Sequence, residues 1–240
     1  MDYNEIDRVF PDLDKQLYKT ITTRADSFEE SLRKSGLTID LSMEEKFDLI
    51  KIFLFSEFIT SSLIKNPGIL KALIESKDLF KFYSNYTYAT KLERKIVNAV
   101  DMDVEKVKEI LLQIKLYETI RIAWRDLTGK ALLEDTLCDL SNLADAIVDI
   151  ATKLIYEDLS KNYGVPVDSE GNFQGLIVLG MGKLGAGELN LSSDIDLIFV
   201  YPKTGYTNGE NIISNEEFFT KVCRRILKFF SPGSHAINFY

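Results

Sequence analysis

The uneven distribution of glycine and proline restricts the fold of this chain more than any other feature. Residues 1–160 contain three glycines and two prolines, whereas residues 161–240 contain ten glycines and three prolines. Because these residues interrupt helices and mark turns, the first part should form long helices and the second should form strands and loops. We therefore predict an α+β, mainly helical fold, with a helical region of residues 1–163 before a smaller core of residues 164–240.

Several helix ends can be recognised in the first part of the chain. The Ser-x-x-Glu pattern of a capping box occurs at Ser27 and at Ser42. Gly36 can close the first of these helices. The helix that begins at Ser42 should continue to Asn66, which can cap another helix with Pro67 as its first residue.

Further helices are expected later in the chain. Asp103 can cap the first of them. Apolar residues at helical spacing from Leu133 to Leu159 indicate a second helix that stops at Gly164. A capping box at Ser214 begins a third helix. The third helix ends near Ser231 and has an apolar face. This face contains Phe218, Phe219, Val222, Cys223, Ile226, Leu227 and Phe230.

Three short segments in the second part favour strands. Leu176–Leu179 and Leu197–Tyr201 are continuous apolar runs, which are typical of buried strands. Ala236–Tyr240 resembles the beginning of a third strand.

The composition excludes several classes of protein. The net charge is −8 and basic tracts are absent, which argues against binding of nucleic acid through its phosphates. Cys138 and Cys223 are far apart and His235 is the single histidine, so a disulfide scaffold and a Cys/His zinc site are excluded. We expect a cytoplasmic protein, since no signal peptide or membrane span is visible.

Other charged or aromatic clusters have ordinary structural explanations. The basic side chains of the last predicted helix fit a solvated face, with a phosphate contact as the alternative. Trp124 and Arg121 fit a packed aromatic beside an ion pair, with partner binding as the alternative. The basic side chains in question are Lys221, Arg224, Arg225 and Lys228.

The glycine-rich turn after the first predicted strand has two interpretations. Gly180-x-Gly182-x-x-Gly185 matches the dinucleotide-binding fingerprint. That fingerprint requires a crossover helix before the next strand, but only Ala186–Ser193 separate the last glycine from Asp194. These residues are too few for a crossover, so the glycines are better explained as a phosphate-binding turn, to which Lys183 can add a positive charge.

Two aspartates complete this second interpretation. Asp194 and Asp196 are two residues apart at the start of a strand, so both side chains should project from one face. Paired carboxylates can hold Mg²⁺, or Mn²⁺, for phosphoryl-transfer chemistry. Ser193 should shape the turn and can contact phosphate. The simpler alternative for the two aspartates is a solvated strand end.

The whole segment resembles a known family. Residues 178–201 read Val-Leu-Gly-Met-Gly-Lys-Leu-Gly-Ala-Gly-Glu-Leu-Asn-Leu-Ser-Ser-Asp-Ile-Asp-Leu-Ile-Phe-Val-Tyr. A glycine turn, about ten residues and then Asp-x-Asp is the pattern of the nucleotidyltransferase superfamily that includes DNA polymerase β. The longer string resembles the glutamine synthetase adenylyltransferase family. Residues 121–129, 140–145 and the helix that ends at Asn66 also resemble that family's helical region.

The resemblance implies a function. Members of the family carry two nucleotidyltransferase units, one that removes AMP from a tyrosine of glutamine synthetase by phosphorolysis, giving ADP, and one that attaches AMP from ATP. The position of the Asp-x-Asp pair resembles the N-terminal, adenylyl-removing unit, with the adenylylating unit as the alternative. The implied partners are glutamine synthetase and, through other parts of a longer enzyme, the PII signalling protein. The implied ligands are Mg²⁺, phosphate and ATP or ADP.

The resemblance also implies a missing group. The superfamily uses a third carboxylate on a neighbouring strand, but no Asp or Glu occurs after Glu217. We therefore expect a truncated chain with an incomplete core and little or no transferase activity alone. A module that only docks glutamine synthetase is the remaining alternative.

Overall fold

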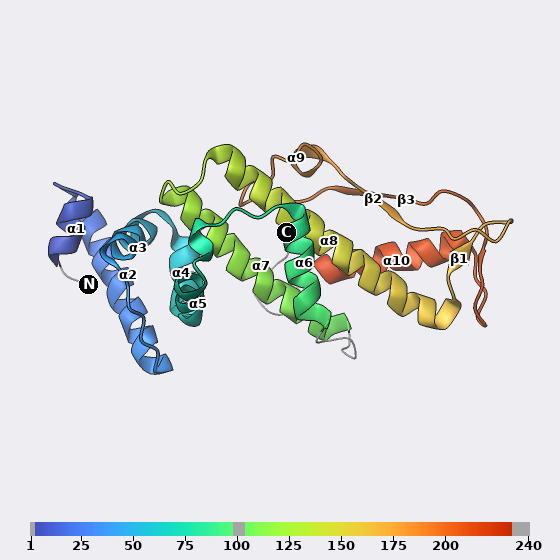
Figure 1. The fold of residues 1–240 in the computed structure, drawn as a ribbon, viewed down its shortest axis with the longest axis horizontal. Coiled ribbons are helices and arrows are strands. Elements are labelled where there is room, and N and C mark those ends of the chain that lie inside the picture. The colour runs from blue at the N-terminus through green and yellow to red at the C-terminus, as the bar shows by residue number, and fades with distance from the viewer. Residues whose placement is uncertain (1–2, 98–103, 232–240) are drawn as a thin grey trace. The chain divides into compact units, whose positions relative to one another are not determined.

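The computed structural model describes residues 3–97 and 104–231, and it is mainly helical with a few short antiparallel strands, as predicted (Figure 1). The chain divides into two compact units. Unit 1 comprises Met1–Phe82 and Tyr117–Thr136, and unit 2 comprises Tyr83–Leu116 and Leu137–Tyr240. The composition predicts a boundary between a helical region of residues 1–163 and a core of residues 164–240, and this domain boundary stays a prediction.

Unit 1 is a bundle of short helices. Its elements are α1 (Tyr3–Val9), α2 (Lys15–Ser35), α3 (Met43–Phe55), α4 (Glu57–Lys65), α5 (Gly68–Ser76), the 3₁₀ helix η1 (Asp78–Phe80) and the second half of α7 (Val104–Leu127). α2 packs against α3 and α4. Phe28 and Phe53 meet in this core with ring centroids 5.9 Å apart, and burial of such apolar side chains stabilises the unit.

Two helix ends in unit 1 agree with the sequence and one does not. Ser42 and Glu45 form the reciprocal capping box, and Gly36 ends α2 with φ +65°. The capping box predicted at Ser27 is wrong, because α2 begins at Lys15 and the Ser27 hydroxyl donates to the carbonyl of Thr23, one turn earlier in the same helix.

The helix predicted from Ser42 to Asn66 is interrupted. Ser56 has extended backbone angles, and its side chain accepts a hydrogen bond from Ile59 N at 3.2 Å, so it ends α3 and caps α4. Pro67 is the cap of α5 rather than its first residue, a difference of one position.

Unit 2 contains long helices and all the described strands. Its elements are α6 (Asn85–Val97), the first half of α7, most of α8 (Leu133–Tyr163), β1 (Pro166–Val167), β2 (Ile177–Gly180), α9 (Gly182–Gly185), β3 (Leu197–Val200), β4 (Tyr206–Thr207) and α10 (Asn215–Phe230). α8 stops before Gly164, which has φ +76°, as expected. The cap predicted at Asp103 and the strand predicted at Ala236–Tyr240 lie outside the described residues, as does His235.

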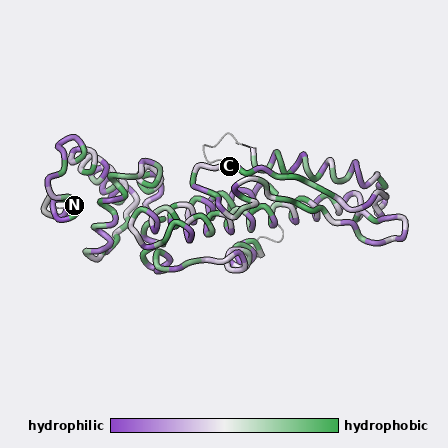
Figure 2. The backbone as a smooth tube through the Cα atoms, turned by 90° about the horizontal axis from the view of Figure 1, so that it is seen from above, coloured by the Kyte–Doolittle hydropathy of each residue, from purple (hydrophilic) through white to green (hydrophobic). Residues whose placement is uncertain are grey.

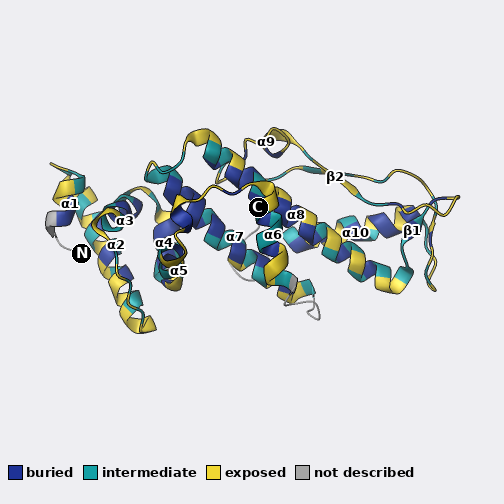
Figure 3. Ribbon diagram, in the orientation of Figure 1, coloured by how far each residue is buried: buried dark blue, intermediate teal, exposed yellow. Residues whose placement is uncertain are grey.

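β2 and β3 pair with each other in antiparallel register and form a ribbon beside α8 (Figure 1). β1 pairs with β4 in a second two-stranded sheet. The prediction that both apolar runs are buried is wrong. Ile177 pairs with Val200 and Leu179 with Ile198, and these four side chains form one face of the ribbon with 41–46% of their surface exposed. In Figure 3 the β2 segment is coloured as exposed and intermediate rather than as buried.

α10 has the predicted cap and most of the predicted face. Ser214 accepts a hydrogen bond from Glu217 N at 3.1 Å. Figure 2 shows the colour along the helices changing between hydrophobic and hydrophilic every few residues, as in amphipathic helices. In α10, Phe218 stacks edge-to-face on Tyr156 of α8. Phe229 is buried, whereas Leu227 is 61% exposed, so the face is rotated slightly from the predicted one.

Among the residues that the structure describes, no helix combines the length and apolar content that a membrane span requires.

Candidate functional site

The antiparallel pairing of β2 and β3 brings the glycine turn beside the two aspartates. Gly180 pairs with Leu197, and the next residue outward, Met181, donates its backbone N–H to the carbonyl of Asp196 at 2.8 Å. A Cβ at Gly182 would lie 3.9 Å from Oδ2 of Asp196. Segments that are separated by more than ten residues in sequence are therefore in contact in the fold.

The turn is built around close backbone approaches. A Cβ at Gly185 would lie 2.4 Å from the carbonyl oxygen of Gly180, and one at Gly180 would lie 3.1 Å from Leu184 Cγ. Gly182 has φ +53°, a region that side chains disfavour. The glycines thus permit a tight turn between antiparallel strands. This arrangement excludes the dinucleotide fold, which needs parallel strands joined by a crossover helix.

Two leucines anchor the segment between the turn and the aspartates. Leu184 is 6% exposed and Leu189 is 2% exposed. The backbone N–H of Leu189 also donates to the hydroxyl of Ser141 on α8 at 3.0 Å. The loop is therefore held against α8 by apolar burial and by a buried hydrogen bond.

Asn190 organises the turn that leads to the aspartates. Ser193 Oγ donates to Asn190 Oδ1 at 2.6 Å, and the backbone N–H of Ser192 donates to the same oxygen at 3.2 Å. The predicted turn-shaping role of Ser193 fits these contacts, and its phosphate contact stays a prediction. The role of Asn190 was missed, although asparagine in Asn-Leu-Ser-Ser is a known turn signal.

Asp194 and Asp196 are exposed, while Ile195 between them is less exposed. The alternation continues into β3, so both carboxylates share a face with Ile198 and Val200. Lys183 is exposed on α9, next to the turn. The turn at Gly182 and the Asp196 carboxylate therefore lie together at one end of the ribbon, and the chemical roles of all the predicted site residues stay predictions.

The two carboxylates fit a magnesium ion. Mg²⁺ in phosphate-handling sites is usually held by one or two carboxylates together with water and substrate phosphates. Residues 3–97 and 104–231 contain no cluster of three or more His, Cys, Asp or Glu side chains that could hold a metal. Within this part of the chain, Asp194 and Asp196 would be the protein ligands, and substrate oxygens would complete the coordination.

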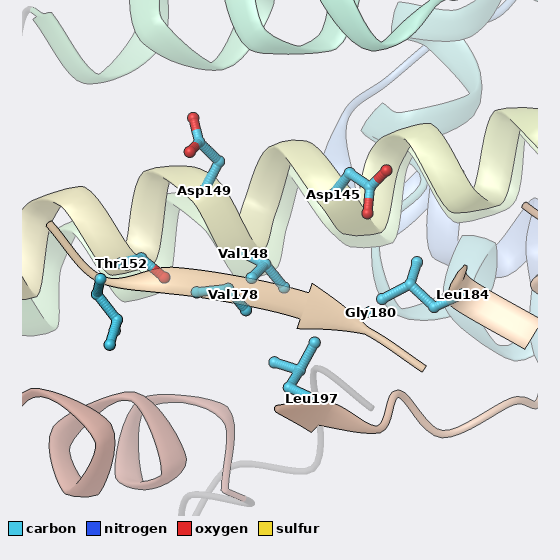
Figure 4. Close-up of a pocket in the computed structure, with 9 residues that line it drawn as sticks. Asp145, Val148, Asp149, Thr152, Val178, Gly180, Leu184 and Leu197 are labelled. Atoms are coloured by element: carbon cyan, nitrogen blue, oxygen red, sulfur yellow. The ribbon is translucent and has the colours of Figure 1, made fainter. Parts of the chain in front are cut away.

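A cavity of about 180 Å³ lies on the opposite face of the ribbon, between β2 and α8 (Figure 4). Val178, Gly180 and Leu197 line it from the ribbon. Because side chains alternate along a strand, this inner face is not the one that carries Asp194 and Asp196. The cavity is therefore separate from the carboxylate pair.

Polar groups of α8 also reach this cavity. Asp145, Asp149 and Thr152 line it. Burial raises the pKa of the Asp145 carboxyl. The Thr152 hydroxyl is buried and has no hydrogen-bond partner among the described residues. Asp145 and Asp149 are exposed overall, so the cost of burying a polar group at this cavity falls on the Thr152 hydroxyl.

The structural explanations for the other clusters hold. Trp124 and Arg121 are fully buried, and Arg121 Nε donates to Glu118 at 2.7 Å, so this cluster belongs to the core of unit 1. On α10, Arg225 pairs with Asp158 at 2.5 Å and Lys221 pairs with Glu217 at 3.2 Å. These two basic side chains are used in ion pairs within the fold.

Comparison with known proteins identifies the family. The model of the glutamate-ammonia ligase adenylyltransferase family matches residues 47–240. A bifunctional glutamine synthetase adenylyltransferase/adenylyl-removing enzyme of Shewanella loihica is 39% identical over 188 residues, which cover 78% of this chain and 19% of that protein. The chain is also similar to two proteins of the same name. The one from Thioalkalivibrio sulfidiphilus is 36% identical over 85% of this chain and 20% of that protein. The one from Pseudomonas aeruginosa is 36% identical over 75% of this chain and 18% of that protein.

The chain spans about a fifth of the length of these curated relatives. The family match nevertheless covers most of the chain and includes the glycine turn and both aspartates. The chain therefore belongs to the glutamate-ammonia ligase adenylyltransferase family.

Proposed function

We propose that this chain is a nucleotidyl-transfer unit that acts on glutamine synthetase and that it works in the adenylyl-removing direction. The observation that carries the proposal is the placement of Asp194 and Asp196 beside the glycine turn, on one exposed face of the β2–β3 ribbon. The names of the relatives, which combine both transfer directions, support glutamine synthetase as the protein substrate.

Each site residue has a defined part in this proposal. Asp194 and Asp196 hold Mg²⁺, which neutralises phosphate charge and orients the reacting oxygens when it is bound. The backbone N–H of Gly182 can approach a phosphate oxygen closely, since no side chain obstructs it. Gly185 has a different part, because it permits the tight turn. The Lys183 ammonium adds a positive charge near the same oxygens.

The proposed reaction is a phosphorolysis. An oxygen of inorganic phosphate attacks the phosphorus of AMP that is attached to a tyrosine. The new phosphorus–oxygen bond produces ADP, and the bond to the tyrosine oxygen breaks. That oxygen takes a proton and restores the tyrosine hydroxyl. The alternative, adenylylating reaction is a separate one, in which the tyrosine oxygen loses its proton and attacks the α-phosphorus of ATP, and pyrophosphate leaves.

Metal binding tests the carboxylate pair directly. We expect Mn²⁺, titrated by calorimetry or by loss of its free paramagnetic resonance signal, to bind the chain and to bind Asp194→Asn at least tenfold more weakly. Glu188→Gln removes an exposed acid from the same loop and is the matched control, for which we expect unchanged binding. Equal Mn²⁺ affinity in all three proteins would contradict the assignment.

The direction of transfer needs a second experiment. The chain is tested at a concentration equal to that of its substrate. The first mixture contains adenylylated glutamine synthetase, phosphate and Mg²⁺. The second mixture contains unmodified glutamine synthetase, ATP and Mg²⁺. Because the chain carries only two of the three carboxylates that the superfamily uses, we expect ADP to form only slowly in the first mixture, and Asp196→Asn to abolish it. Incorporation of AMP in the second mixture alone would reverse the assigned direction.

A docking-only role is the second candidate, because the described residues hold no third acid beside the pair. Glutamine synthetase that binds the chain without transfer in either mixture would establish it.

A further inference from the structure

A groove on α6 combines aromatic and basic side chains, and none of its residues belongs to the candidate transfer site. Its volume is about 460 Å³, within the range of small-molecule sites. All the residues that line it come from α6 and from Tyr83, which precedes it. They comprise two tyrosines, two threonines and three basic residues, with no acid.

The three basic residues lie on one side of the helix. Lys91, Arg94 and Lys95 are three and four residues apart, a spacing that places side chains next to one another. Like charges at this spacing oppose helix formation. The helix dipole favours Arg94 and Lys95, which lie in the last turn, but Lys91 lies a turn earlier. The exposed side chains of Arg94 and Lys95 therefore make the C-terminal end of the groove basic.

Acidic side chains do not neutralise the end of this groove. In the part of the chain that the structure describes, Arg94 and Lys95 form no ion pair, and both side chains are exposed. The ammonium of Lys91 lies 4.6 Å from the centre of the Tyr83 ring, which fixes it above an aromatic face. Arg94 and Lys95 thus form a positive pair in a chain whose net charge is −8.

An exposed aromatic ring occupies the other end. Tyr86 is 81% exposed, although a tyrosine ring carries a large apolar surface. Tyr86 and Arg94 are eight residues apart, which corresponds to about 12 Å along a helix axis. A ligand with a flat ring stacked on Tyr86 could thus reach the basic residues through an attached chain of phosphates.

We propose that this groove binds a nucleoside diphosphate or triphosphate. The base stacks on Tyr86, and the phosphates are held by Lys91, Arg94 and Lys95 through charge-assisted hydrogen bonds. Neither interaction requires a metal ion. The site is separate from the proposed transfer reaction and does not depend on it.

Calorimetric titration with ADP in the presence of EDTA tests this site. The protein is the full chain carrying Asp194→Asn, so that neither the first aspartate nor a metal supports binding at the transfer site. We expect one ADP to bind per chain. The double variant Arg94→Ala/Lys95→Ala should bind ADP at least tenfold more weakly, and Lys153→Ala, which removes an exposed lysine of α8, should bind it as the parent does.

Substitutions at the aromatic end separate stacking from charge. Tyr86→Ala should weaken ADP binding about fivefold or more, whereas Tyr86→Phe, which retains the ring, should not. Pyrophosphate and adenosine should each bind more weakly than ADP. The proposal is overturned if ADP does not bind, if Arg94→Ala/Lys95→Ala binds it as the parent does, or if pyrophosphate binds as tightly as ADP.

Discussion

Replacement of Gly185 by alanine tests whether the turn depends on close backbone contact. The added Cβ would lie 2.4 Å from the Gly180 carbonyl oxygen, about 1 Å short of an ordinary van der Waals contact. The obstructing atom is backbone at the end of β2, so it cannot rotate away as a flexible side chain would. By analogy with overpacked cores, we expect Gly185→Ala to destabilise the turn by about 1–3 kcal/mol.

Hydrogen exchange measures this effect where it arises. Gly185 N–H donates to Met181 O at 3.2 Å, and Glu188 N–H donates to Lys183 O at 2.8 Å. A loss of 1–3 kcal/mol should accelerate exchange of these amides by about 5- to 150-fold. Ala186→Ser changes the exposed neighbouring residue and should leave the rates within about twofold. If Gly185→Ala exchanges no faster than Ala186→Ser, the close approach does not hold the turn.

Three further substitutions have expected outcomes that denaturant unfolding monitored by circular dichroism can check. Thr152→Val removes the unpartnered hydroxyl at the cavity and should stabilise the chain by about 1 kcal/mol, whereas a loss of stability would mean that the hydroxyl is satisfied. Burial raises the pKa of Asp145, so its charged form opposes folding. Asp145→Asn should therefore stabilise the chain at neutral pH, and this gain should vanish below the ordinary pKa of 3.8. The pKa of Asp168 is lowered to about 2 by hydrogen bonds from the Asn172 backbone and side chain, from Lys203 and from the Glu170 backbone. Its stabilising effect should therefore be complete above pH 3.8 and be lost as the pH falls toward 2, a loss that Asp168→Asn should not show.

The sequence predicted the local geometry around the glycine turn better than it predicted how that segment packs. The short separation between Gly185 and Asp194 was sufficient to exclude a crossover helix, and the antiparallel pairing of β2 with β3 follows from it. Spacing of two residues likewise placed Asp194 and Asp196 on one face. These features are local, so neighbouring residues determine them.

The errors arose where distant residues decide the outcome. Ser27 matches a capping box, but α2 continues through it because its apolar side packs on α3 and α4. Ser56 interrupts a helix without glycine or proline nearby. The continuous apolar runs of β2 and β3 suggested burial on both sides, yet a run without alternation does not reveal how many partners a strand has.

The pairing register of the ribbon determines which face carries the carboxylates. A slip of one residue would turn Asp194 and Asp196 toward α8, since strand side chains alternate between faces. There they would meet the cavity that Asp145 and Asp149 already line, in surroundings that raise the pKa of Asp145 by burial. Asp145 and Asp149 are themselves exposed on α8, and four carboxylates close together would repel one another. Like-charge repulsion thus disfavours the slipped register, in which the predicted metal-binding pair would leave the open face.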